Sequence, residues 1–207
     1  MTVRLTLYAT AGRATRNTVL GDGPLDPGDI GGAVLPPYEA VIRGPSTRCA
    51  QAAAALGLEA ESVPEPALRD LDHGTWRGRT IGDIADADPY GLSAWFTDPD
   101  ATPPGGESVR QLCRRTLPWL RGLPSAPRSG APDAHTLVIA EPAVVRALLV
   151  NAMSVPATAF WHLDVPALSA VSLTSRDDGW VWDVESRGAP VVRSRRPVDT
   201  SGSRVGI

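Results

Sequence analysis

The sequence predicts an α/β fold, specifically a three-layer α/β/α sandwich with a mostly parallel central sheet. Short apolar segments that suit strands alternate along the chain with segments of helical periodicity, which is the pattern of this fold class. The length of 207 residues is enough for one domain with a full core. The hydrophobic fraction of 43% and the charged fraction of 21% are those of an ordinary globular protein.

The first part of the chain begins with an apolar–polar alternation over 3–8 that predicts a strand. The region 21–37 is rich in Gly, Pro and Asp and is expected to be mostly loop. Residues 39–43 suit a buried strand, and 62–64 a short one. Between them, an Ala-rich helix is expected over 47–56, with Gly57 at its carboxyl end.

The second part continues the alternation. Short helices are expected over 81–86 and 90–97, within a helical insertion at about 81–103. The clearest amphipathic helix covers 107–120. A buried strand over 136–140 and a helix over 143–153 follow, and 165–174 with 179–185 resemble an antiparallel strand pair at the sheet edge. We expect one domain over 1–187 and a flexible tail rich in Arg, Ser and Pro over 188–207.

Charge and composition narrow the class of protein. The net charge of −3 gives no strong attraction to nucleic acid or to a membrane, so neither is an expected partner. No signal peptide is visible and no apolar stretch approaches the ~20 residues of a membrane helix, so we expect a cytoplasmic protein. Cys49 and Cys113 match no metal spacing and are expected to pack in the core. No metal or cofactor is expected.

Five segments, in order, resemble the blocks of the histidine phosphatase superfamily, also called phosphoglycerate-mutase-like. They are Leu5-Thr6-Leu7-Tyr8-Ala9-Thr10-Ala11-Gly12, Gly44-Pro45-Ser46-Thr47-Arg48-Cys49-Ala50-Gln51, Leu68-Arg69-Asp70-Leu71-Asp72-His73-Gly74, Pro104-Gly105-Gly106-Glu107-Ser108 and Val138-Ile139-Ala140-Glu141-Pro142. The segment from Phe160 to Ser169 is similar to actinobacterial members. The resemblance covers about residues 2–185 and implies the fold of that family.

The resemblance also implies a chemistry. In the family, a first His attacks phosphorus, two Arg and a second His hold the phosphoryl oxygens, and a carboxylic acid protonates the leaving oxygen. Here Ala9 and Thr10 stand where the family has Arg-His, and Glu141 stands for the second His. Arg48 matches a phosphoryl-binding Arg and Asp70 matches the acid.

The charges at these positions favour a different reaction. Arg48 would face Asp70 and Glu141, with Glu107 nearby, because Glu107 matches a position that supplies the acid in some members. Like charges ~4 Å apart repel by about 4 kcal/mol at an effective dielectric constant of 20. We therefore expect a phosphohistidine mechanism to be excluded and phosphate to bind badly.

The leading hypothesis is a repurposed enzyme that is not a phosphatase. Glu141 and Asp70 would be its catalytic acid and base, because repulsion between two carboxylates raises one pKa. The reaction would be a cyclisation, dehydration, isomerisation or epimerisation of a small organic metabolite that is not a phosphomonoester, in bacterial specialised metabolism. The expected substrate-binding residues are Arg48, Thr10, Glu107, His73 and His162.

Several alternatives stay open at this point. Glu141 can simply pair with Arg48, Asp70 can be a loop carboxylate paired with Arg69 or Arg77, and Glu107 suits the first turn of a helix. For the whole protein, one alternative is a non-catalytic pseudophosphatase that binds a ligand or regulates a partner. The other is a phosphatase that uses Asp70 and Arg48 with water as the nucleophile. The sequence leaves the oligomeric state undetermined.

Overall fold

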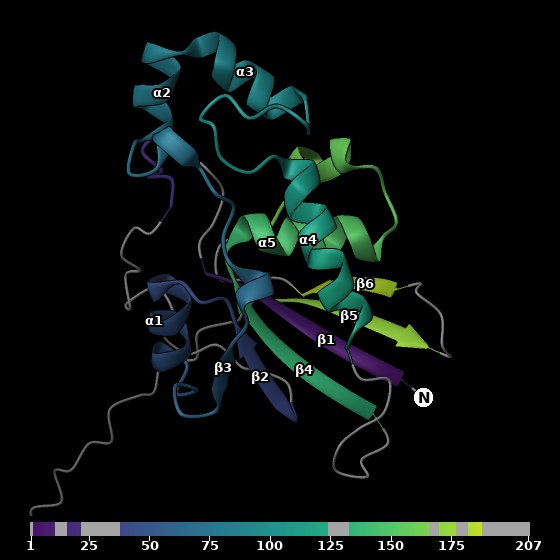
Figure 1. The fold of residues 1–207 in the computed structure, drawn as a ribbon. Coiled ribbons are helices and arrows are strands. Elements are labelled where there is room, and N and C mark those ends of the chain that lie inside the picture. Colours follow the sequence, from purple (N-terminus) through teal and green to yellow (C-terminus); the bar gives the residue numbers. More distant parts are fainter. Residues whose placement is uncertain are drawn as a thin grey trace, which may run out of the picture.

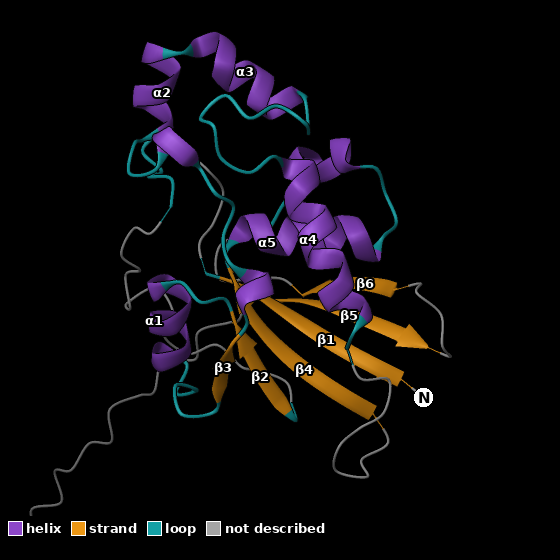
Figure 2. Cartoon of the chain, viewed as in Figure 1, coloured by secondary structure: helices purple, strands orange, loops and turns teal. Residues whose placement is uncertain are grey.

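A six-stranded mixed sheet forms the centre of the computed structural model, which describes residues 2–10, 16–21, 38–123, 133–165, 170–176 and 182–187 (Figures 1 and 2). The order is β3-β2-β4-β1-β5-β6. The first four strands in this order are parallel, and β5 and β6 are antiparallel to their neighbours. The strands are β1 (Thr2–Ala9), β2 (Ala40–Arg43), β3 (Ser62–Pro64), β4 (Asp133–Ala140), β5 (Ala170–Arg176) and β6 (Trp182–Arg187). The predicted fold class is confirmed.

Helices cover both faces of this sheet. Alternate residues of a strand point to opposite faces, and β4 follows this rule: Leu137 and Ile139 pack in the cluster of α1 (Thr47–Ala55), whereas Val138 packs in the cluster of the helices on the other face. Those helices are α4 (Val109–Arg121) and α5 (Pro142–Ala152), which lie in front of the sheet in Figure 1. One apolar cluster lies on each face of the sheet, between the sheet and the helices that cover it, so the fold has three layers.

Capping residues set the helix bounds. The Ser46 hydroxyl accepts from the Cys49 amide at the start of α1, and Gly57, with φ +74°, follows its end. The expected helix over 107–120 begins two residues later, at Val109, because Ser108 and Gln111 form a capping box.

Two short helices, α2 (Ile81–Ala87) and α3 (Pro89–Thr97), lie in the segment for which a helical insertion was predicted. They stand apart from the sheet, at the top of Figure 1. Two single-turn 3-10 helices precede them in the sequence: η2 (Pro66–Leu68) and η3 (Gly74–Trp76). The predicted tail over 188–207 lies outside the described residues.

The segment before β5 differs from its prediction. A strand was expected from residue 165, but β5 begins at Ala170, and Val165 follows a 3-10 helix, η4 (Ala157–His162). The sequence analysis missed η4, which supplies Trp161 to the site described below. Residues 166–169 are outside the described part of the chain.

The cysteines are core residues, as predicted. Cys49 and Cys113 are both buried and free. Burial is the main cause that raises the pKa of Cys49 to about 12 and that of Cys113 to about 11. In the described part of the chain, no helix has the length and apolar character needed to cross a membrane.

Candidate active site

The candidate site lies at the carboxyl ends of the central parallel strands, where open α/β sheets commonly bind ligands. Thr10 follows β1 and Glu141 follows β4, and these two strands pair with Ala9 opposite Ala140. The Thr10 amide continues the ladder by donating to the Ala140 carbonyl at 3.0 Å. Strand pairing therefore brings together two side chains that are far apart in the sequence.

Glu141 is the centre of a buried polar cluster. Its side chain is 2% exposed. Its Oε2 accepts from Thr10 Oγ1 at 2.8 Å and from Arg48 Nη1 at 2.9 Å, and its Oε1 accepts from Ser46 Oγ at 2.8 Å. Glu141 is also the N-cap residue of α5, but it makes no side-chain cap bond there, so its carboxylate serves this cluster.

Burial raises the pKa of Glu141. The negative charge of Asp70 raises it further, whereas Arg48 and the hydrogen bonds from Thr10 and Ser46 act in the opposite direction. The desolvation of a carboxylate beside a second carboxylate outweighs its three donors, so Glu141 takes up a proton more readily than an ordinary Glu.

Asp70 and His73 form a second polar group. Asp70 Oδ1 accepts from the Leu71 amide at 2.8 Å, and its Oδ2 lies 3.7 Å from His73 Nε2. Arg69, a partner considered for Asp70, instead pairs with Glu107 at 3.4 Å. His73 is 8% exposed, and its Nδ1 has no hydrogen-bond partner in the part of the chain that the structure describes.

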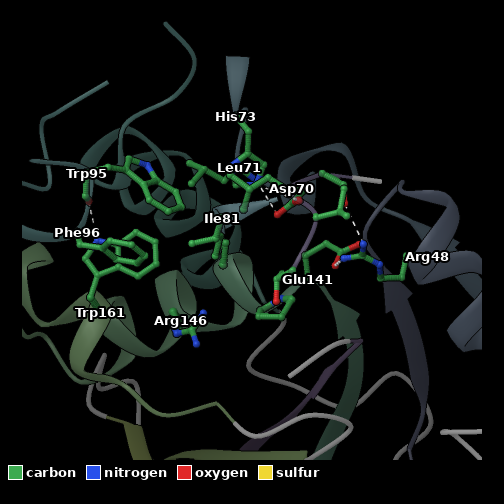
Figure 3. Close-up of a pocket in the computed structure, with 16 residues that line it drawn as sticks. Arg48, Asp70, Leu71, His73, Ile81, Trp95, Phe96, Glu141, Arg146 and Trp161 are labelled. Atoms are coloured by element: carbon green, nitrogen blue, oxygen red, sulfur yellow. Dashed lines mark hydrogen bonds and ion pairs between the residues drawn. The ribbon is translucent and has the colours of Figure 1, made fainter. Parts of the chain in front are cut away.

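A pocket joins these groups. It holds about 600 Å³ of empty space, including space open to solvent. Figure 3 shows Arg48, Asp70 and Glu141 on one side, aromatic rings on the other, and Arg146 between Glu141 and Trp161. The described lining residues are Thr18, Val19, Leu20, Gly21, Arg48, Asp70, Leu71, His73, Ile81, Trp95, Phe96, Glu141, Pro142, Ala143, Arg146 and Trp161.

Arg146 is a lining residue that the sequence analysis missed. Its Nε donates to the Leu163 carbonyl at 3.0 Å. Burial lowers its pKa and Asp164 opposes this, but a guanidinium remains charged at physiological pH. A signal was available, because Arg146 is the only charged residue in the otherwise mostly apolar α5.

Glu107 lies outside the described lining. Arg115 Nε donates to its Oε1 at 2.8 Å and Arg115 Nη2 to its Oε2 at 2.9 Å, so the carboxylate is held in a bidentate pair. His162, also expected to bind substrate, is exposed at the end of η4 and is not in the lining either. Thr10 is 0% exposed and reaches the pocket only through Glu141.

These positions change the charge count of the pocket. The sequence analysis placed Arg48 against Asp70, Glu141 and a nearby Glu107. In the structure, Arg48 and Arg146 line the pocket with Asp70 and Glu141, and Glu107 is neutralised elsewhere. The sequence analysis expected more negative than positive charge in the pocket, and this is wrong for the described lining. Two Arg side chains there face two carboxylates, so the formal charges are equal in number. Within the described residues, no group of three or more His, Cys, Asp or Glu side chains is placed to hold a metal ion.

Comparison with known proteins identifies related chains. A model of the histidine phosphatase superfamily (branch 1) matches residues 36–186. A bifunctional protein of Mycobacterium tuberculosis and an uncharacterized protein of Mycobacterium bovis are each 32% identical to this chain over 134 residues, which are 63% of this chain and 36% of theirs. The chain thus spans little more than a third of the length of these curated relatives.

Solved structures share the fold at low identity. A mycobacterial glucosyl-3-phosphoglycerate phosphatase matches with a TM-score of 0.72 and 19% identity, over 91% of this chain and 100% of its own. YhfR of Bacillus stearothermophilus matches with a TM-score of 0.68 and 20% identity, over 90% of this chain and 97% of its own. A putative alpha-ribazole-5'-P phosphatase of Escherichia coli matches with a TM-score of 0.67 and 17% identity, over 92% of this chain and 98% of its own.

These findings correct the function expected from the sequence. The expectation of a cyclase, isomerase or related enzyme that is not a phosphatase is wrong, because the matching family model and the named activities among these solved structures are those of phosphatases. The non-catalytic alternative has no better support. The physical reason for the error is the charge count, which lacked Arg146 and included Glu107.

Proposed function

Because the chain belongs to the histidine phosphatase superfamily, we propose that it is a phosphatase that hydrolyses the phosphoric monoester of a small organic alcohol. The observation that carries this proposal is the presence of two guanidinium groups, from Arg48 and Arg146, in the lining of the pocket that also contains Asp70. A phosphoryl dianion needs such cations, and Arg holds its oxygens through paired N–H groups.

The phosphoryl group would lie between Arg48 and the amino end of α5. Pro142 and Ala143 of the first turn of α5 are in the lining, and the amino end of a helix favours an anion. Arg146 projects from the same helix. Together these groups supply the positive potential that the family's chemistry requires.

Glu141 would act as a positioning residue. Its carboxylate holds the Arg48 guanidinium at 2.9 Å. Its raised pKa means that Glu141 takes up a proton more readily than an ordinary Glu, and in its neutral form it would not repel phosphate. The buried carboxyl group that seemed to forbid phosphate binding is therefore compatible with it.

Water is the proposed nucleophile. Thr10 is fully buried beneath Glu141, so its hydroxyl is not accessible to a substrate. His135 is held by a hydrogen bond between its Nε2 and Thr6 Oγ1 at 2.8 Å, and His162 lies outside the described lining. Phosphoryl transfer passes through a loose transition state, and its catalysis depends mainly on positioning and charge stabilisation. A water molecule held in the pocket can therefore serve as the nucleophile.

Asp70 would supply the proton for the leaving group. It is in the lining and its side chain is 19% exposed. The bond from phosphorus to the water oxygen forms while the bond to the ester oxygen breaks. Asp70 would take up a proton from solvent and pass it to the departing alcohol, and the attacking water would lose a proton to solvent, so alcohol and inorganic phosphate are the products.

Release of inorganic phosphate from a panel of phosphomonoesters tests this proposal. We expect Arg48→Ala, Arg146→Ala and Asp70→Asn each to lower kcat/KM by about a hundredfold or more, because each removes a group that stabilises the transition state. Arg110→Ala is the matched control, since Arg110 pairs with Asp100 outside the described lining. Equal turnover by all variants, or no turnover of any ester by wild type, contradicts the proposal.

A further inference from the structure

The half of the pocket away from the Arg48–Glu141 pair is aromatic, and we propose that it binds the organic part of the substrate as a flat aromatic group. This inference rests on the proposed phosphatase function and specifies the alcohol that the phosphate ester carries.

Three rings from two separate segments form this aromatic wall. Trp95 and Phe96 come from α3, and Trp161 comes from η4. Their ring centroids lie 4.5 Å apart for Trp95 and Trp161, 4.9 Å for Phe96 and Trp161, and 5.2 Å for Trp95 and Phe96. Trp161 Nε1 also donates to the Trp95 carbonyl at 3.0 Å, which fixes the two segments together. The wall is therefore preformed, as ligand sites usually are.

The aromatic wall is partly open to the pocket. Trp95 is buried, but Phe96 and Trp161 are only partly buried, and all three rings are in the lining. Ile81 and Leu71 continue the apolar surface toward the charged side, as Figure 3 shows. A flat apolar group that packs against these rings would remove this surface from water.

His73 stands where the two halves meet. Its ring lies 5.9 Å from Trp95 in an edge-on arrangement, and its Nε2 faces Asp70 at 3.7 Å. Within the described residues its buried Nδ1 has no partner. Buried polar atoms are nearly always hydrogen-bonded, so this nitrogen calls for a polar atom on a ligand near the ester oxygen.

The same surface disfavours a sugar phosphate. Apart from Arg146, which would hold the phosphoryl group in the proposed function, the described lining beyond His73 is mostly aliphatic and aromatic, so several sugar hydroxyls would lose water and gain few hydrogen-bond partners. A site that leaves polar groups of a ligand unpaired rejects that ligand strongly. The pocket therefore selects an aromatic alcohol over a polyhydroxylated one.

The test compares 2-naphthylmethyl phosphate with glucose 6-phosphate and glycerol 3-phosphate as substrates. Calorimetry also measures binding of 2-naphthylmethanol, which carries no phosphate, so that binding of the organic part is separated from turnover. We expect the naphthyl ester to have the highest kcat/KM and the free alcohol to bind.

Variants locate the effect. Phe96→Ala removes one ring of the wall, and we expect about tenfold weaker binding of the alcohol and an equal fall in the preference for the naphthyl ester over glycerol 3-phosphate. Tyr90→Ala is the matched control, because Tyr90 is an aromatic residue of α3 that is 88% exposed, and it should leave both values unchanged.

The outcomes are distinguishable. Preference for a sugar phosphate, or no binding of the alcohol by a protein that turns over esters, overturns the aromatic site and leaves the phosphatase proposal intact. Binding of the alcohol that depends on Phe96, without turnover of any ester, supports the aromatic site and removes the phosphatase proposal. Equal effects of Phe96→Ala and Tyr90→Ala also overturn the site.

Discussion

Thr10 and Glu141 touch across two neighbouring strands: Thr10 Oγ1 donates to Glu141 Oε2 at 2.8 Å, although the residues are 131 positions apart in the chain. The contact depends on the register of β1 against β4, in which Ala9 lies opposite Ala140. A slip of one residue would turn each side chain to the other face. The polar cluster is thus fixed by the same pairing that holds the middle of the sheet.

Removal of the Thr10 hydroxyl should destabilise the protein. Thr10→Val keeps the shape but takes a donor from a buried carboxylate, which costs about 1–3 kcal/mol of unfolding free energy. Denaturation by urea measures this change. Thr97→Val on the exposed face of α3 is the control and should change stability by less than about 0.5 kcal/mol. Equal losses in the two variants would show that Thr10 contributes through shape alone.

The free energy of unfolding should depend on pH because the pKa of Glu141 is raised in the folded protein. A folded-state pKa above the ordinary value of 4.5 means that the folded protein binds the proton more tightly than the unfolded chain does. The resulting stability is fully present below pH 4.5 and is lost as pH rises through the folded-state pKa. Glu141→Gln lacks this titration.

Melting temperatures of wild type and Glu141→Gln, measured from pH 4 to pH 8, test this. We expect the wild type to lose stability relative to the variant as pH rises. The reverse trend would mean that the Arg48 ion pair dominates and that the pKa of Glu141 is lowered.

Glu107 should matter for stability and not for turnover. Its carboxylate is held by both Arg115 Nε and Nη2 and is mostly buried. Glu107→Ala leaves Arg115 without this partner and should cost about 3 kcal/mol. We expect kcat/KM, measured at a temperature where the variant is folded, to stay within about twofold of wild type, in contrast to Asp70→Asn. A large fall in kcat with unchanged stability would return Glu107 to the active site.

The two thiols should be unreactive in the folded protein. Burial raises the pKa of Cys49 to about 12 and that of Cys113 to about 11, so few thiolates exist at pH 8. Ellman's reagent should label neither cysteine in native protein and both after unfolding in guanidinium chloride. Rapid labelling of one thiol without denaturant would contradict the buried positions.

The sequence predicted most of the fold because the strands and helices carry local signals. The alternation in β1 and the Gly57 that follows α1 each act within a few residues. The predicted strand start at residue 165 was wrong because Val165 is apolar for a different reason: it packs in the core cluster of α4 and α5 after η4.

The candidate site was less predictable because its charges are set by contacts between distant segments. The family motif identified Arg48, Asp70 and Glu141, which the fold does bring to one pocket. Arg146 belongs to no quoted motif position that binds phosphate. The Arg115 side chain, which removes Glu107 from the charge count, lies within α4, whereas Glu107 precedes that helix. Neither effect follows from spacing alone.

The hydrogen bond from Trp161 to the Trp95 carbonyl has a consequence for how this pocket can diversify. It joins α3 to η4, and neither segment contributes a strand to the sheet that carries Thr10 and Glu141. The proposed selectivity for the alcohol and the proposed reactivity toward the ester are therefore encoded by separate stretches of the gene. Exchange of the α2–α3 segment and η4 between homologues should transplant substrate preference while the reacting end of the pocket is inherited unchanged.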